Sequence, residues 1–232
     1  MNGKFYGLGV GPGDPELLTL KAINILREVD VVAVPESKKE MGSTAMEIAM
    51  PYLKFDVQIL TLTFPMIRDV ETKNKIRRDN ALLIADQLKA GRNVAFLTLG
   101  DPMLYSTYLY LLETLTTIGV EPISVPGIYS FSAISNLLNR PLVKGDESLA
   151  VISEFSAQKW NTLQDFQTVV FMKVSAYSQE LHQELNSSSK WDFTMVTNAG
   201  KPSQVISFNP SDLLEGVHYF TTVILSKSEV VN

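Results

Sequence analysis

The stretch GLGVGPGDPELLT, residues 7–19, places four glycines and two prolines in thirteen positions. A glycine-rich turn near the start of an α/β chain often binds a nucleotide phosphate, but the spacing here matches neither the dinucleotide fingerprint nor a Walker A loop. Counted from Gly7, the third glycine of the fingerprint would have to stand at Pro12. Pro12 and Pro15 also lack the N–H groups that a phosphate site uses. The stretch therefore predicts a strand, a tight turn and a helix.

The second half of this stretch is typical of a helix start. Asp14 is expected as the N-cap, with Pro15 at the first helical position and Glu16 near the positive end of the helix. An ordinary strand-to-helix turn without any ligand remains an alternative interpretation of the whole stretch.

Outward from this stretch, apolar segments alternate with amphipathic helical patterns through the first half of the chain. Strands are expected at 4–10, 30–34, 57–63, 93–99 and 120–125, with helices at 15–28, 43–53, 69–90 and 103–117. This alternation predicts a mostly parallel sheet covered by helices.

The regular alternation of strands and helices ends in the second half of the chain. A helix is expected at 129–138 and another at 178–186, with strands at 149–153, 168–174, 193–197, 204–208 and 219–226. Closely spaced strands with one helix among them indicate a mixed or antiparallel sheet. The predicted fold class is therefore α/β with two α/β domains, residues 1–121 with a mostly parallel sheet and residues 122–232 with a mixed sheet.

Composition narrows the function classes. The chain has 232 residues, of which 45% are hydrophobic and 19% charged, and it has no cysteine. Disulfides, a thiolate nucleophile and a cysteine metal site are thereby excluded. His182 and His218 are too few and too far apart in the sequence to suggest a metal site, so we expect no protein-bound metal. A net charge of −5 argues against nucleic acid as the main partner.

The pattern of apolar residues bears on location. No apolar run reaches the length of a membrane span, and the first residues lack the apolar region of a signal peptide. We therefore expect a cytoplasmic protein with no membrane partner.

A first candidate site is LTLGDPMLYSTY, residues 97–108. In open α/β sheets, ligands bind outside the carboxyl ends of the strands. Gly100 permits close approach of a ligand there, and Asp101 either places a carboxylate at that edge or serves only as a helix N-cap. Tyr105 and Tyr108 are predicted to share a helix face, and such an aromatic stripe either belongs to a site or packs in the core.

Two further segments are candidates. In VPGIYSFSA, residues 125–133, an apolar strand again runs into Pro-Gly and a helix, which suits a site or a serine-capped hinge. In NRPLVKGDE, residues 139–147, Arg140 and Lys144 either meet an acidic ligand or belong to an exposed loop.

Taken together, GLGVGPGDPELLTLKA, GDPMLYSTY and VPGIYSFSA, in this order and at this separation, resemble the tetrapyrrole methylases, which are S-adenosylmethionine-dependent enzymes of cobalamin and sirohaem synthesis. The segments FPM at 64–66, YSTY at 105–108 and RPLVKGDESL at 140–149 resemble the branch that methylates C20 of precorrin-2. The resemblance covers essentially the whole chain. It implies two α/β domains with the cofactor in the cleft between them.

The resemblance also implies cofactor contacts, carried over position by position. The matched residues are Pro12, Leu99, Gly100, Asp101, Tyr129, Ser130, Met172, Ala199 and Thr222. Tyr129 departs from the family pattern, because a small hydroxyl residue is usual there. A backbone contact is therefore what the resemblance implies at Tyr129.

The implied reaction is methyl transfer to C20 of precorrin-2 or of cobalt-factor II, with S-adenosylhomocysteine as the product and any cobalt arriving with the substrate. Alignment of carbon, methyl and sulfur alone can be worth about 7–11 kcal/mol. A base could then take the C20 proton. Asp101, Tyr105 and Tyr108 are the nearest candidates by motif, although Asp101 suits positioning of the cofactor better.

The implied substrate carries many carboxylates, so a basic rim is expected to offset the net negative charge. Loop residues expected to face the tetrapyrrole are Gly11, Gly13 and Asp14, and the basic candidates are Arg68, Arg77, Arg78, Arg140 and Lys144. Family members are usually homodimers, so a homodimer is expected.

Several alternatives stay open. Within the same family, the chain could be another corrin-pathway methylase or a relative that methylates a protein or RNA, although the net charge disfavours RNA. A nucleotide-dependent oxidoreductase is disfavoured by the failed fingerprint. A non-catalytic binder of S-adenosylmethionine is the third alternative.

Overall fold

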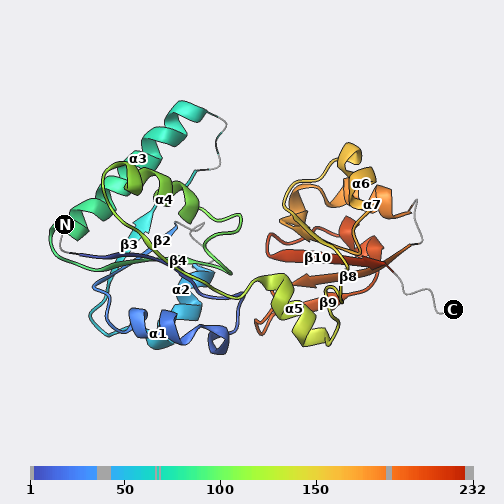
Figure 1. Cartoon of the computed structure of the whole chain (residues 1–232), viewed down its shortest axis with the longest axis horizontal. Coiled ribbons are helices and arrows are strands. Elements are labelled where there is room, and N and C mark those ends of the chain that lie inside the picture. The colour runs from blue at the N-terminus through green and yellow to red at the C-terminus, as the bar shows by residue number, and fades with distance from the viewer. Residues whose placement is uncertain (1–2, 36–42, 66, 68, 187–189, 228–232) are drawn as a thin grey trace. The chain divides into compact units, whose positions relative to one another are not determined.

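The protein is described by a computed structural model that covers residues 3–35, 43–65, 67, 69–186 and 190–227. The chain divides into two compact units, Met1–Tyr129 and Ser130–Asn232, and each is considered by itself (Figure 1). Met66 and Arg68, named above, lie outside the described residues. In the part of the chain that is described, every helix is too short or too polar to cross a membrane.

The first unit is built on a five-stranded sheet in the order β3-β2-β4-β1-β5. Every neighbouring pair in this sheet is parallel, which confirms the predicted parallel sheet. The strands are β1 (Phe5–Gly9), β2 (Val31–Pro35), β3 (Gln58–Leu62), β4 (Val94–Thr98) and β5 (Ile123–Val125).

Helices cover both faces of this sheet, with α1 and α2 on one side and α3 and α4 on the other (Figure 1). Leu8 and Leu97 face α1 and α2, whereas Phe5 and Phe96 face α3 and α4. Central strands that are apolar on both sides are what a parallel sheet buried between helices requires. The helices are α1 (Leu20–Leu26), α2 (Thr44–Ala49), α3 (Val70–Lys89) and α4 (Tyr108–Thr117), with short 3₁₀ turns at η1 (Pro15–Leu17) and η2 (Met50–Tyr52).

Two predicted helices begin later than their sequence pattern indicates. Asp14 does cap a helical turn, since its side chain accepts the N–H of Glu16 at 2.8 Å, but that turn is only the 3₁₀ segment η1. Leu18 is extended, and Thr19 then caps α1. The prediction that the helix of 103–117 starts at 103 is wrong, because α4 begins at Tyr108.

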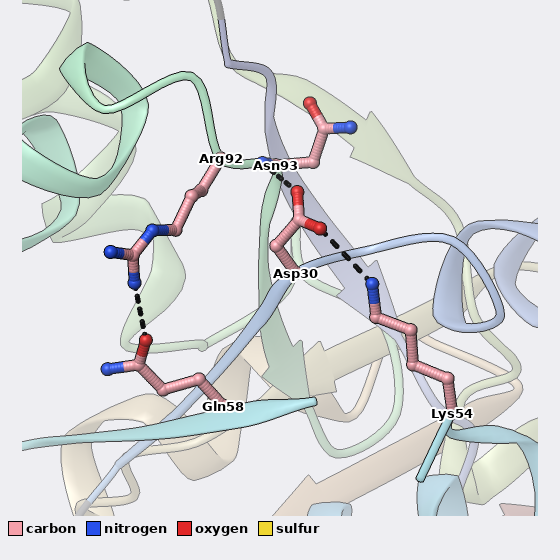
Figure 2. A network of polar contacts seen from close by, with 5 residues as sticks. All are labelled: Asp30, Lys54, Gln58, Arg92 and Asn93. Atoms are coloured by element: carbon pink, nitrogen blue, oxygen red, sulfur yellow. Dashed lines mark hydrogen bonds and ion pairs between the residues drawn. The ribbon is translucent and has the colours of Figure 1, made fainter. Parts of the chain in front are cut away.

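A polar network fixes the amino-terminal edge of the same sheet (Figure 2). The carboxylate of Asp30, just before β2, accepts the backbone N–H of Asn93 at 2.8 Å and the Nζ of Lys54 at 3.1 Å. Next to it, Arg92 donates to the side chain of Gln58 at 2.7 Å. These contacts join the starts of β2, β3 and β4.

The division between the units falls after Tyr129, whereas the sequence analysis placed the domain boundary between residues 121 and 122. The reason is that β5 pairs with β1, with Tyr6 opposite Ile123 and Leu8 opposite Val125. This pairing makes β5 part of the first sheet.

The second unit contains a five-stranded sheet in the order β6-β7-β10-β8-β9. β6 and β7 are parallel and the other three pairs are antiparallel, so the predicted mixed sheet is confirmed. The strands are β6 (Leu149–Ile152), β7 (Thr168–Met172), β8 (Trp191–Thr197), β9 (Val205–Ser207) and β10 (Thr221–Lys227).

One face of this sheet packs against α5 (Ser130–Leu138), and the other packs against α6 (Ala157–Leu163) and α7 (Ser178–Asn186) (Figure 1). Short 3₁₀ turns form η3 (Val174–Ala176) and η4 (Pro210–Leu214). The sequence analysis missed α6. This helix has seven residues and buries only Trp160 and Leu163, which is too little to show a helical period.

Candidate functional site

The loops that follow β1, β4 and β5 meet at the carboxyl edge of the first sheet. The N–H of Gly11 donates to the carbonyl of Gly100 at 3.2 Å, and the N–H of Gly100 donates back to the carbonyl of Gly11 at 2.8 Å. A Cβ on Gly127 would lie 2.1 Å from the carbonyl oxygen of Gly100, and one on Gly9 would lie 2.5 Å from the nitrogen of Gly127. Several glycines of the motifs are therefore needed so that three loops can pack backbone to backbone.

Asp101 holds two of these loops together. It is 7% exposed, and its two carboxylate oxygens accept the N–H of Met103 at 2.8 Å and the N–H of Gly127 at 2.9 Å. The expected role as the cap of a long helix is replaced by a cross-link between the turn after β4 and the turn after β5. Because both of its oxygens are already engaged by backbone N–H groups, Asp101 suits positioning of the loops better than proton transfer.

Tyr129 lies beside Asp101 at this edge. Burial raises the pKa of the Tyr129 hydroxyl, and the neighbouring Asp101 carboxylate raises it further. The phenol is therefore a neutral hydrogen-bond donor next to a carboxylate. The resemblance implied only a backbone contact here, and the position of the side chain beside Asp101 was not foreseen from the sequence.

The two tyrosine candidates do not lie on one helix face. Tyr108 is fully buried, with its ring centroid 6.0 Å from that of Phe5 and 6.4 Å from that of Phe96. A Cβ on Gly7 would lie 2.2 Å from this ring, so Gly7 makes room for it. Burial raises the pKa of the Tyr108 hydroxyl, which hydrogen-bonds the Ser124 hydroxyl at 2.8 Å. Tyr108 is therefore a core residue, the alternative that the sequence analysis had left open.

Tyr105 stands in the turn that precedes α4. Its backbone is left-handed, with a φ of 52°, and its side chain is exposed. The turn is closed by Ser106, whose hydroxyl donates to the carbonyl of Pro102 at 2.8 Å and accepts the N–H of Tyr108 at 3.0 Å. Tyr105 therefore belongs to the turn that follows Asp101, and not to the helix that was expected to carry it.

This edge has features that fit a ligand lying against the main chain. A Cβ on Gly100 would meet only the carbonyl of Ile128, at 3.9 Å, so the space beside Gly100 is open. The hydroxyl of Thr98, at the end of β4, is buried and has no hydrogen-bond partner among the described residues. Open space beside a glycine at the carboxyl end of a central strand suits a ligand that lies against the main chain, such as part of a nucleoside cofactor.

In the second unit, four of the predicted cofactor residues lie at one end of the sheet. Met172 on β7 stands opposite Thr222 on β10, and the hydroxyl of Thr222 lies 3.1 Å from that of Ser130 at the start of α5. Ala199 follows β8, whose Thr197 stands opposite Thr221 at the same end. Residues far apart in the sequence are thereby assembled by the register of three strands.

Lys173 is a residue at this end that the sequence analysis did not single out. It follows Met172 directly, and its backbone is left-handed with a φ of 58°. Burial lowers the pKa of its amine. Left-handed backbone at a residue other than glycine carries strain. Nothing in the local sequence pattern signals this conformation.

Arg140 and Lys144 lie at the opposite end of the same sheet. They line a groove together with Thr168 and Ser226, which pair with each other four residues along the strands from Met172 and Thr222. At about 3.3 Å per residue, the two ends are roughly 13 Å apart. The structure therefore does not bring these two cations together with the predicted cofactor residues of this unit.

Two of the remaining predicted basic residues, Arg77 and Arg78, lie on α3. Arg77 and Arg78 border a small groove between α3 and α4, and the guanidinium of Arg77 lies 3.6 Å from the ring centroid of Tyr110. Arg68 is outside the described residues. Among those that are described, no three His, Cys, Asp or Glu side chains gather in a way that could hold a metal ion.

Comparison with known proteins adds an independent observation. Residues 4–213 match the family model described as Tetrapyrrole (Corrin/Porphyrin) Methylases. The chain is 42% identical over 179 residues to a probable cobalt-precorrin-2 C(20)-methyltransferase of Methanocaldococcus jannaschii, with 77% of this chain and 75% of the relative covered. It is 38% identical over 176 residues to the cobalt-precorrin-2 C(20)-methyltransferase of Salmonella typhimurium, covering 75% and 74%.

A solved structure shares the fold. The crystal structure of the cobalt precorrin-4 methyltransferase CbiF superposes with a TM-score of 0.74 at 20% identity, covering 96% of this chain and 94% of that one.

Proposed function

The chain belongs to the tetrapyrrole (corrin/porphyrin) methylase family, and from that premise we propose that it is the C20-methyltransferase of cobalamin biosynthesis. It would transfer a methyl group from S-adenosylmethionine to C20 of cobalt-factor II or of metal-free precorrin-2. The observation that carries this proposal is the 42% and 38% identity, over about three quarters of the chain, to two relatives named for that reaction. Both names specify the cobalt form, which favours a cobalt-loaded substrate.

Methyl transfer from S-adenosylmethionine needs few catalytic side chains. When bound, S-adenosylmethionine supplies a methyl group on a sulfonium, which is a strong electrophile with a good leaving group. The work of the protein is to hold the C20 carbon in line with that methyl group, and alignment of this kind is worth about 7–11 kcal/mol. The C20 proton then leaves, and its electron pair returns to the ring system.

We assign cofactor binding to the matched residues, Pro12, Leu99, Gly100, Asp101, Tyr129, Ser130, Met172, Ala199 and Thr222. The open space beside Gly100 supports a ligand at the carboxyl edge of the first sheet. In this assignment Asp101 fixes the loops that the cofactor contacts, since both of its oxygens already accept backbone N–H groups. Of the predicted bases, Tyr105 is an exposed residue, whereas Tyr108 is enclosed in the core.

For the tetrapyrrole we propose the first loop, with Gly11, Gly13 and Asp14. Gly11 has a φ of 78° and shares two backbone hydrogen bonds with Gly100, so this loop is held against the proposed cofactor segment. Arg140 and Lys144 were predicted to contact the substrate, and they line a groove at the other end of the second unit's sheet. We further propose that the enzyme works in the cytoplasm as a homodimer.

The test is a pair of anaerobic incubations of the protein and S-adenosylmethionine, one with precorrin-2 and one with its cobalt complex. Mass spectrometry counts the added methyl groups, and NMR locates them. We expect one methyl group at C20, with the cobalt complex as the better substrate. Tight cofactor binding without C20 methylation would instead place the chain with another activity of the family. Binding of a nicotinamide dinucleotide without S-adenosylmethionine would support an oxidoreductase.

A paired substitution tests the assigned cofactor contacts. Thr222→Val removes the hydroxyl that faces Ser130 at 3.1 Å, and it should raise the dissociation constant for S-adenosylhomocysteine several-fold. Thr221→Val is the matched control. It removes the neighbouring hydroxyl, which points to the other face of β10 and pairs with Thr197 at 2.8 Å. Equal effects of the two substitutions on cofactor affinity would contradict the assignment.

A further inference from the structure

We infer that Tyr177 is a positioning residue for the proposed cofactor site, and that it acts through the turn that follows β7. In this turn Met172, which is assigned to the cofactor, is succeeded by Lys173. Tyr177 itself stands between η3 and α7. Because Met172 is assigned to the cofactor only under the proposed function, this role of Tyr177 rests on that function.

The hydroxyl of Tyr177 reaches back over the turn. It donates to the carbonyl of Met172 at 2.6 Å, a normal length for a hydrogen bond between oxygens. The ring is 6% exposed, with its centroid 5.9 Å from that of Phe155 and 6.5 Å from that of Phe171. The Tyr177 carbonyl accepts the N–H of Leu181 in α7 at 3.1 Å. Core packing and a helix start therefore fix the position of this donor.

The turn has an unusual backbone at Lys173. Its φ of 58° and ψ of 36° lie in the left-handed region, which a residue with a Cβ disfavours. In the described part of the chain, the other residues besides glycine with a positive φ are Tyr105, Asn139 and Asn198. Asparagine tolerates this region. The tyrosine and the lysine do not, and each stands shortly after an assigned cofactor residue, as strained backbone at a functional site would.

Hydrogen bonds hold the peptide groups on both sides of Lys173. The carbonyl before it, that of Met172, accepts the Tyr177 hydroxyl. The carbonyl of Lys173 itself accepts the N–H of Ala176 at 3.2 Å. Because peptide groups are planar, orienting these two carbonyls sets the φ and ψ angles between them. The surroundings therefore impose the left-handed backbone, and the residue type does not favour it.

A glycine at position 173 would make this turn without support. Glycine takes a positive φ without a Cβ penalty, as Gly91 and Gly119 do elsewhere in the chain. With lysine there, the turn depends on the Tyr177 hydroxyl. Loss of that hydroxyl should let Lys173 relax to a more favourable backbone and reorient the peptide that follows Met172.

The strand register connects this peptide to the other assigned residues. Met172 stands opposite Thr222 on β10, and the Thr222 hydroxyl lies 3.1 Å from that of Ser130. A reoriented peptide would move the end of β7 relative to these two hydroxyls. The ring of Tyr177 packs in the core on the α6 and α7 side of the sheet, so its influence on the cofactor passes through Met172.

The test measures affinity for S-adenosylhomocysteine by calorimetric titration. Tyr177→Phe keeps the ring in the aromatic core and removes only the hydroxyl. It should raise the dissociation constant roughly ten-fold, the scale on which residues that support a binding contact act.

Thr168→Val is the matched control. The Thr168 hydroxyl is buried on the same strand and also donates to a carbonyl at 2.6 Å, that of Leu142, but at the other end of β7. This substitution should lower the melting temperature about as much as Tyr177→Phe does and leave the affinity unchanged. Equal effects of the two substitutions on affinity would overturn the positioning role.

Substitutions of Lys173 separate positioning from general destabilisation. In the Lys173→Gly protein the backbone no longer opposes a positive φ, so adding Tyr177→Phe should raise the dissociation constant only about two-fold. A loss of the same size in both backgrounds would show that the hydroxyl does not act through this turn. Lys173→Gly should also melt at a higher temperature than Lys173→Ala, because the two differ only in the Cβ that this backbone disfavours. The reverse order would contradict the strain.

The wild type distinguishes this role from the proposed function. If the wild type does not bind S-adenosylhomocysteine, the proposed cofactor and the role of Tyr177 are overturned together. If it binds and Tyr177→Phe binds equally well, only the positioning role is overturned.

Discussion

The carboxylate of Asp101 accepts the backbone N–H of Gly127 at 2.9 Å, across 26 positions of sequence. The same side chain accepts the N–H of Met103 at 2.8 Å. One residue thus links the turn after β4 to the turn after β5, at the edge where Gly11 and Gly100 exchange backbone hydrogen bonds. The geometry of this edge depends on a buried charge and its two donors.

Replacing Asp101 should therefore destabilise the first unit and weaken cofactor binding together. Asp101→Ala leaves two backbone donors without their acceptor, which is expected to cost about 1–3 kcal/mol of unfolding free energy. Asp101→Asn should also lower stability and cofactor affinity, because its NH₂ group would face one of the two backbone N–H donors in place of a carboxylate oxygen. Urea unfolding and calorimetric titration with S-adenosylhomocysteine measure the two effects. Asp86→Ala, at an exposed ion pair on α3, is the control and should leave both nearly unchanged.

Gly127→Ala should be among the most damaging single substitutions in the first unit. The added Cβ would stand 2.1 Å from the carbonyl oxygen of Gly100, and a backbone atom cannot move aside as a side chain can. We expect a loss of about 3 kcal/mol or more from this overpacking. Gly119→Ala separates clash from backbone strain, because Gly119 has a φ of 80° but open space around it. It should lose about 1–2 kcal/mol. A Gly127→Ala protein as stable as Gly119→Ala would show that the loops tolerate separation.

Tyr108→Phe should lower stability without slowing methyl transfer. The substitution removes the hydroxyl that bonds Ser124 at 2.8 Å, and the expected loss is about 0.5–1.5 kcal/mol. Because burial raises the pKa of the Tyr108 hydroxyl, the phenol stays protonated near neutral pH and does not act as the base. Single-turnover rates and chemical denaturation check the two halves of this prediction. A large fall in the rate at unchanged stability would restore Tyr108 as a base.

Acid should weaken the network at Asp30. The hydrogen bond from the N–H of Asn93, followed by that from Lys54, lowers the pKa of the Asp30 carboxyl. A lowered folded-state pKa adds stability above the unfolded value of about 3.9 and loses it as the pH falls through the folded value. The stability difference between the wild type and Asp30→Asn should therefore be constant near neutral pH and shrink below about pH 4. A difference that grows on acidification would have the wrong sign for this account.

Much of the fold could be predicted from local sequence. Alternating apolar segments and amphipathic stretches identified the parallel sheet and the mixed sheet, because each pattern has the period of its own element. The prediction of helices failed in two places, one where the helix is too short to show a period and one where a turn has the residue spacing of a helix. The segment of α6 is too brief to show a period, and residues 102–107 have helical spacing but form turns closed by Ser106.

At the candidate site, too, the sequence predicted local features but not the contacts between distant residues. The sequence identified Gly100, Asp101 and the Pro-Gly of residues 126–127 as special, because glycine and proline constrain the backbone wherever they occur. It did not identify Gly127 as the partner of Asp101, and it left open whether Tyr108 packs in the core, where its ring lies against Gly7. Those contacts depend on which strands are neighbours.

The sequence by itself thus determined which segments form strands and helices and which turns need glycine, since these follow from interactions within a few residues. Only the tertiary structure decided that Asp101 joins two loops, that Met172 and Thr222 share one end of a sheet, and that Arg140 lies at the other end. The physical reason is that strand order and register place residues in contact irrespective of their separation in the chain, and neither is encoded in a local period.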